Sequence, residues 1–106
     1  MLKIKSFKDK QEFKKIEMVG HTNYREEGSD IVCAAASAII ITGINGILSL
    51  NLGSIDYQEE KDLVTIKVIT NDDITNKLLE SMVNLLIELT KDYPDNAKYI
   101  EEEYRD

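Results

Sequence analysis

The chain has 106 residues, of which 42% are hydrophobic and 31% are charged, with a single proline. These proportions indicate an ordered globular protein and exclude the disordered and collagen-like classes. Thirteen Lys and Arg residues against twenty Asp and Glu residues give a net charge of −7, which opposes the phosphate neutralisation on which direct nucleic-acid binding depends.

The N-terminal half predicts two strands followed by a loop. Residues 2–7 alternate as in a short strand, the lysine-rich residues 8–15 predict a turn or connection, and residues 16–21 predict a second strand. His21 lies at the end of this second strand, on the same face as Glu17 and Val19. The next residues have turn chemistry and predict a surface loop: Thr22, Asn23, Tyr24, Arg25, Glu26, Glu27, Gly28 and Ser29.

A helix is predicted from residue 31 to residue 46 or 48, with Asp30 as its N-cap, which would place Cys33 in the first helical turn. Residues 31–50 carry no charge over a length that approaches a bilayer span. Several small and polar residues interrupt this stretch, and acidic rather than basic residues lie close before it. We therefore expect a helix buried inside a small domain and no membrane association.

The C-terminal half predicts a hairpin, a second helix and an optional strand. Residues 50–57 and 63–69 flank the polar link 58–62 and are expected to join the sheet that carries His21. Residues 70–73 supply caps for a helix that ends before Pro94, and residues 97–104 form a possible edge strand. The helix has an apolar stripe that we expect to be core: Leu78, Leu79, Met82, Leu85, Leu86, Leu89 and Tyr93.

This order of elements predicts an α/β (α+β) two-layer sandwich, with a mixed sheet of four to five strands and two helices packed on one face. The length predicts a single domain spanning residues 1–106. The alternating N-terminus does not resemble a signal peptide, and a lone cysteine excludes an intrachain disulfide, so a reducing compartment is expected. No recognised zinc spacing and no phosphate-binding glycine loop occur, so no metal or nucleotide cofactor is expected.

Cys33 and His21 are the candidate catalytic pair. A cysteine in the first turn of a helix faces unpaired backbone N–H groups and the positive end of the helix dipole, which favour thiolate and can hold an oxyanion. A neutral imidazole near the thiol can take its proton and later deliver it to a leaving amine. The spacing alone gives only weak support to a catalytic pair, because lone cysteines and histidines are commonly structural.

Two further residues have both a catalytic and a structural interpretation. Asp30, three residues before Cys33, is placed either to orient His21 or to cap the helix, and capping is the favoured reading. Ser37 lies one helical turn beyond Cys33 on the same face, where it either lines the site or bonds a backbone carbonyl of its own helix.

The run Gly20-His21-Thr22, followed by residues 28–38 with the sequence GSDIVCAAASA, resembles the signature of the ribosomal-processing cysteine protease family. In that family a Gly-His at a strand end and an Asp-Ile-Val-Cys-Ala-Ala-x-Ser at a helix start carry the active site. The resemblance places the nucleophile on Cys33 and the base on His21, with supporting positions at Gly20, Asp30 and Ser37. Thr22 departs from the small alanine that usually follows the histidine, which bears on loop mobility and substrate preference.

The resemblance implies a bacterial cytoplasmic Cys-His endopeptidase that removes an N-terminal extension from large-subunit ribosomal protein twenty-seven during ribosome assembly. It also implies a homodimer and a mobile loop over the site, which here would be Thr22 to Ser29. The family's substrates present paired phenylalanines before the cut, so a pocket with apolar walls is expected near Cys33.

Two readings without proteolysis remain open at this stage. One is a non-catalytic ribosome-assembly module that holds a basic protein segment against the acidic surface implied by the charge of −7. The other is a redox sensor in which Cys33 is oxidised reversibly, although no second cysteine is available in the chain to resolve a sulfenic acid.

Overall fold

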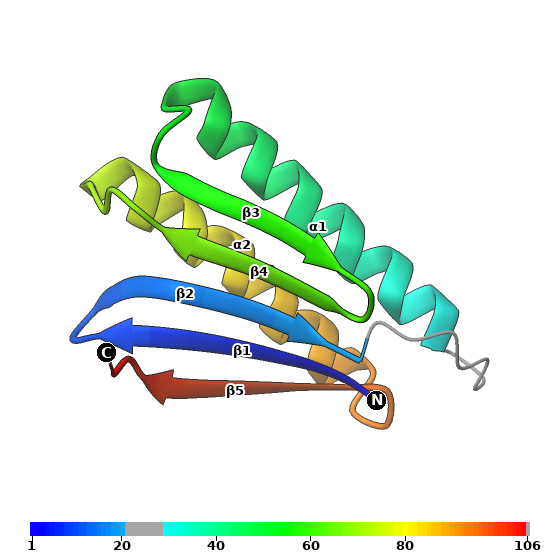
Figure 1. The fold of residues 1–106 in the computed structure, drawn as a ribbon. Helices are drawn as coiled ribbons and strands as arrows, with labels where there is room; N and C mark the ends of the chain where they lie inside the picture. Colours follow the sequence, from blue (N-terminus) through cyan, green and yellow to red (C-terminus); the bar gives the residue numbers. More distant parts are fainter. Residues whose placement is uncertain (21–28, 106) are drawn as a thin grey trace.

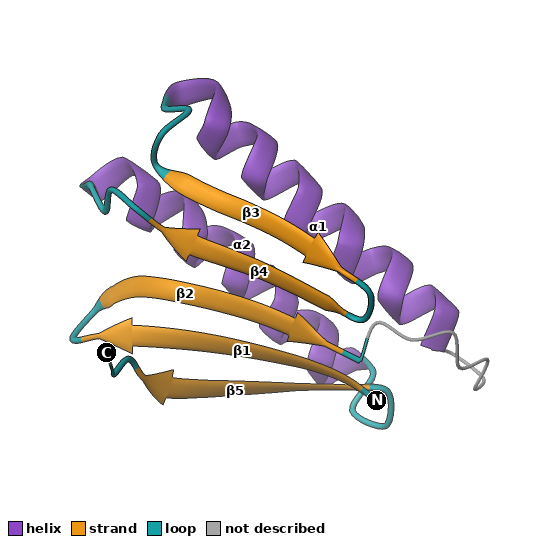
Figure 2. Ribbon diagram, in the orientation of Figure 1, coloured by secondary structure: helices purple, strands orange, loops and turns teal. Residues whose placement is uncertain are grey.

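A computed structural model describes the backbone of residues 1–20 and 29–105. It contains a five-stranded sheet in the order β3-β4-β2-β1-β5, with helices α1 and α2 together on one face (Figures 1 and 2). The bounds are β1 Leu2–Asp9, β2 Glu12–Val19, α1 Ser29–Leu50, β3 Ile55–Glu60, β4 Leu63–Val68, α2 Asp73–Asp92 and β5 Ala97–Glu103. Strand β5 runs parallel to β1 and the other pairings are antiparallel, so the predicted mixed sheet with two helices on one face is confirmed.

The lysine-rich residues 8–15 lie mostly in β1 and β2, which corrects the prediction of a turn over this stretch. Only Lys10 and Gln11 separate β1 from β2, and Lys10 adopts a positive φ of 60°. The ammonium of Lys8 lies 4.5 Å from the centre of the Phe13 ring, and that of Lys15 lies 4.6 Å from the centre of the Phe7 ring. Their aliphatic stems can pack along the strands while the charged ends remain near water, so lysine content did not prevent strand formation.

Helix α1 is longer at both ends than the sequence predicted. It begins at Ser29 and continues to Leu50, so the following strand starts only at Ile55 and not at residue 50. One stripe of the helix enters the core, at positions spaced by three or four residues: Val32, Ala36, Ile40, Ile44 and Ile47. By length and composition the stretch Ile31–Leu50 is a candidate membrane span, and 28% of its most apolar window is buried. The predicted burial of this helix inside the domain therefore holds for one stripe only.

Helix α2 begins where the sequence predicted. The backbone N–H of Thr75 donates a hydrogen bond of 2.7 Å to Oδ1 of the N-cap residue Asp72, and this bond lowers the pKa of that carboxyl. Leu79, Met82, Leu86 and Leu89 of the predicted stripe are buried. Leu85 and Tyr93 are 49% and 38% exposed, so for these two residues the prediction of core positions was wrong.

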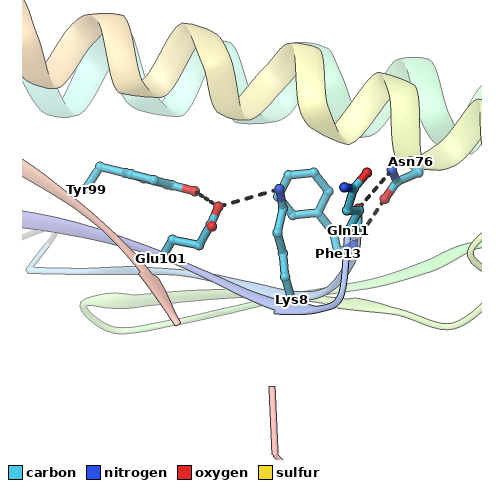
Figure 3. Close-up of polar contacts among 6 residues, drawn as sticks. All are labelled: Lys8, Gln11, Phe13, Asn76, Tyr99 and Glu101. Carbon is cyan, nitrogen blue, oxygen red and sulfur yellow. Dashed lines mark hydrogen bonds and ion pairs between the residues drawn. The ribbon is translucent and has the colours of Figure 1, made fainter. Parts of the chain in front are cut away.

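Polar side chains at the start of α2 form hydrogen bonds with the turn between β1 and β2 and the first residues of β2 (Figure 3). The N–H of Phe13 donates to Oδ1 of Asn76 at 3.1 Å, and Nδ2 of Asn76 donates to the Gln11 carbonyl at 3.4 Å. Nδ2 of Asn71 donates to the Phe13 carbonyl at 2.7 Å. These bonds join residues about sixty positions apart and set the position of α2 on the sheet.

Candidate active site

Cys33 lies near the start of α1 but not in its first turn. Because the helix begins at Ser29, Cys33 is the fifth helical residue, and Asp30 lies within the helix and not at its N-cap. The predictions of an Asp30 cap, of Ser29 as a loop residue and of Cys33 in the first turn were therefore wrong by one or two positions. The N–H groups without an intrahelical acceptor belong to the first four residues of a helix, so here they immediately precede Cys33 in the chain.

The side chain of Cys33 is partly buried and packs against the hydrophobic core. Val32 and Ala36 on either side of it are fully buried, which fixes the rotation of the helix and thereby the direction in which Cys33 points. A thiol held at the boundary between core and solvent has a defined position and remains within reach of another molecule.

Gly20 directly follows β2 and adopts a backbone conformation that suits glycine. Its φ is +87°, and a Cβ built there would clash with the backbone carbonyl oxygen of Met1. Its N–H donates to the carbonyl of Asp62 at 3.2 Å, which ties it to the turn between β3 and β4. Gly20 thus fixes the point and direction at which the chain leaves the sheet, one residue before His21.

The described residues contain part of the predicted site. Cys33, Ser37 and the backbone of Asp30 belong to α1, and Gly20 directly follows β2. The predicted base His21 and the loop residues 22–28 lie outside the described residues. The pairing of Cys33 with a histidine therefore stays a prediction.

Ser37 lines a cavity of about 220 Å³ between α1 and the sheet. Tyr57 and Glu59 of β3 also line this cavity, and the Tyr57 hydroxyl donates a hydrogen bond of 3.2 Å to Oε2 of Glu59. Burial, followed by the bond to Glu59 and its negative charge, raises the pKa of the Tyr57 hydroxyl. The sequence analysis did not identify Tyr57 or Glu59, although strand alternation places both on one face of β3.

A metal centre is not indicated by the part of the chain that the structure describes. Among these residues, no three His, Cys, Asp or Glu side chains come together in a group that could hold a metal ion.

Comparisons with known proteins indicate the same family as the sequence motif formed by residues 20–22 and 28–38. Residues 1–98 match the family model described as cysteine protease Prp. The chain is 32% identical over 84 residues to the ribosomal processing cysteine protease Prp of Staphylococcus aureus, covering 76% of this chain and 79% of that one.

Two crystal structures of the S. aureus ribosomal processing protease Prp share the fold. The one in complex with a substrate peptide has a TM-score of 0.89 at 24% identity, and covers 96% of this chain and 100% of the other. The one with a covalently linked product peptide has a TM-score of 0.84 at 25% identity, with the same coverage.

Proposed function

Because this chain belongs to the Prp family of cysteine proteases, we propose that it cleaves one peptide bond of a protein substrate with Cys33 as nucleophile and His21 as general base. The observation that carries the proposal is the match of the family over residues 1–98, a range that contains one cysteine and one histidine. Among the residues that the structure describes, Cys33 is also the one cysteine, and it lies at the partly exposed start of α1.

The proposed reaction has two steps. His21 takes the Cys33 proton, the thiolate sulfur attacks the peptide carbonyl carbon, and the C–N bond breaks as the imidazolium returns the proton to the leaving amine. A water molecule that His21 deprotonates then attacks the thioester carbon and the C–S bond breaks. The imidazolium returns its proton to the Cys33 sulfur, and the acid product leaves and ionises to the carboxylate. The N–H groups at the start of α1 are the nearest helix donors for the oxyanion formed in each step.

The substrate that we propose is the N-terminal extension of large-subunit ribosomal protein twenty-seven, cut in the bacterial cytoplasm. The relative in S. aureus is named as a ribosomal processing protease, and its structures hold a substrate peptide and a covalently linked product peptide. The net charge of −7 suits a basic protein segment. Residues 1–106 would act as one protease domain.

We further propose that two copies associate through the outer face of the helices. A groove of about 450 Å³ runs between α1 and α2 and is lined mainly by small and apolar residues, which include Ala38, Gly46 and Leu85. Leu85 is 49% exposed there, and the apolar helix α1 is largely uncovered. A second copy would remove this apolar surface from water, which favours association.

The test is mass spectrometry of a peptide that spans the extension and first mature residues of the organism's own ribosomal protein twenty-seven. We expect one cut by the wild-type chain and none by Cys33→Ala or His21→Ala, with all three chains folded by circular dichroism. Retained cleavage by Cys33→Ala would show that Cys33 is not the nucleophile. Binding of the peptide without any cleavage by folded wild-type chain would favour a non-catalytic binding module.

A further inference from the structure

The face of the sheet that is turned away from the helices is covered by no helix or strand of the described chain (Figure 2). Side chains alternate between the two faces of a strand, and the buried ones face the helices, so the register identifies those on this open face. They form three rows, read from β5 through β1, β2 and β4 to β3: Lys98, Lys3, Val19, Leu63 and Glu60; Ile100, Lys5, Glu17, Thr65 and Gln58; Glu102, Phe7, Lys15, Lys67 and Asp56.

Lysines are concentrated on this open face. Its three rows hold five lysines and four carboxylates, whereas the whole chain has thirteen Lys and Arg against twenty Asp and Glu. Three of the four carboxylates belong to the edge strands: Glu60, Asp56 and Glu102. The fourth is Glu17, and its Oε2 lies 3.6 Å from the Lys15 ammonium. The acidity behind the net charge of −7 therefore lies mostly on other surfaces, and the centre of the open face is basic.

Two pairs of lysines lie directly opposite each other on neighbouring strands. Lys3 of β1 pairs with Lys98 of β5, and Lys15 of β2 pairs with Lys67 of β4. Like charges at opposite positions repel and destabilise a sheet. Within its row Lys3 has Val19 on its other side, so no carboxylate stands beside the pair that it forms with Lys98. The stability of the fold gives no reason for this pair, whereas an anion bound across it would remove the repulsion.

An open hollow of about 430 Å³ lies on the same face and combines aromatic rings with cations. It is lined by two rings, two cations and two carboxylates: Phe7, Tyr104, Lys15, Arg105, Glu102 and Glu103. The Lys15 ammonium lies 4.6 Å from the centre of the Phe7 ring. A nucleic-acid base can stack on an aromatic ring, a cation attracts its phosphate, and a carboxylate can accept hydrogen bonds from its amino group.

We propose that the open face of the sheet binds single-stranded RNA, with phosphates at Lys3, Lys5 and Lys98 and a base in the hollow beside Phe7. A phosphate backbone carries a charge at every nucleotide and has no N–H groups that need acceptors. An acidic peptide fits this face less well, because the central strands have already paired their backbone groups and offer it only side chains. The site is separate from Cys33, which lies on a helix at the other face.

The test is the fluorescence anisotropy of a labelled single-stranded RNA of twelve nucleotides. Wild type should bind it with a Kd below about 100 µM at about 50 mM salt. Lys3→Glu and Lys98→Glu should each weaken binding at least about fivefold and lower the slope of log K against log salt by about 0.7, the loss of one phosphate contact. Lys77→Glu makes the same change of charge on α2, outside the open face, and should leave the affinity close to that of wild type.

Thermal unfolding separates RNA binding from folding. Lys3→Glu and Lys98→Glu each replace a pair of like charges with a pair of opposite charges, so neither should unfold at a lower temperature than wild type. Weaker binding by a chain of equal or greater stability would support the proposal. No binding by folded wild type, or equal weakening by Lys77→Glu, would overturn it. Displacement of the RNA by polyglutamate at equal concentration would assign the face to an acidic protein segment and would also overturn it.

Discussion

Gly20 approaches Met1 so closely that a Cβ at position 20 would clash with the carbonyl oxygen of Met1. The two residues flank neighbouring strands: Met1 precedes β1 and Gly20 follows β2, and Lys3 pairs with Val19 in their antiparallel register. The N-terminus of the chain therefore fixes the backbone that immediately precedes His21. This contact links the sheet to the candidate catalytic base.

Gly20→Ala is expected to destabilise the fold and to reduce activity together. Its positive φ costs a residue with a Cβ about 1–3 kcal/mol, and the clash with Met1 adds to this cost by displacing the chain before His21. Thermal unfolding and kcat/KM measure the two effects. Gly53→Ala is the control, because its Cβ would make only ordinary contact, 3.7 Å from Oδ1 of Asn51. Equal melting temperatures for both variants would contradict this account.

Asn76→Ala is expected to destabilise the protein by about 1–3 kcal/mol, because it removes the acceptor for the part-buried N–H of Phe13. Asn76→Asp keeps an acceptor for the Phe13 N–H but replaces the donor to the Gln11 carbonyl with an oxygen, so it should destabilise the protein less than Asn76→Ala but still measurably. Urea unfolding followed by circular dichroism gives both values. An Asp variant less stable than the Ala variant would show that the bond to Phe13 is unimportant.

The Asp72 cap predicts acid sensitivity. Its carboxyl pKa is lowered in the folded chain, chiefly by the hydrogen bond from the Thr75 N–H. The stabilisation is therefore present above the pKa of the unfolded chain, near 4, and is lost as the pH falls through the lower folded value. Asp72→Asn keeps a capping oxygen that does not titrate. Wild type should be more stable than this variant at pH 7 and should lose the advantage progressively as the pH falls below the pKa of the unfolded carboxyl; a constant difference would contradict the linkage.

Leu85→Glu is expected to convert a dimer into a monomer without unfolding it, because Leu85 lines the groove between the helices and is 49% exposed. Light scattering after size-exclusion chromatography measures the mass. Ile74→Glu, at a position 63% exposed and outside that groove, should leave the mass at two chains. A wild-type mass of one chain at micromolar concentration would reject the homodimer.

The sequence predicted which helices and strands form more accurately than it predicted the residues at which they begin and end. The alternation of Leu2, Ile4 and Ser6 and the helical spacing from Leu78 to Leu89 correctly indicated β1 and α2. The lysines after Phe7 concealed the rest of the first hairpin, because the ammonium groups of Lys8 and Lys15 lie over aromatic rings that only folding brings near. The start of α1 was misplaced because Asp30 is as compatible with a first helical turn as with a cap.

From the sequence, only relationships between residues within one continuous segment of the candidate site could be predicted. Cys33 and Ser37 could be related by helical spacing, and Gly20 marked the end of a strand. The cavity beside Ser37 could not be predicted, because Met18, Val64 and Glu59 become neighbours only through the register of three strands. Such registers depend on tertiary packing and turn geometry, which no local pattern in β3 specifies.

In the proposed reaction the sulfur of Cys33 forms the covalent bond to the substrate. A peptide chloromethyl ketone tests this most directly. The reagent should carry the residues before the cut, and intact-protein mass spectrometry should follow its addition to the wild-type chain. We predict one adduct per chain, located on Cys33 by peptide mapping, and none on Cys33→Ala or with a reagent of scrambled sequence. No adduct on folded wild-type chain, or the same adduct on Cys33→Ala, would contradict the account.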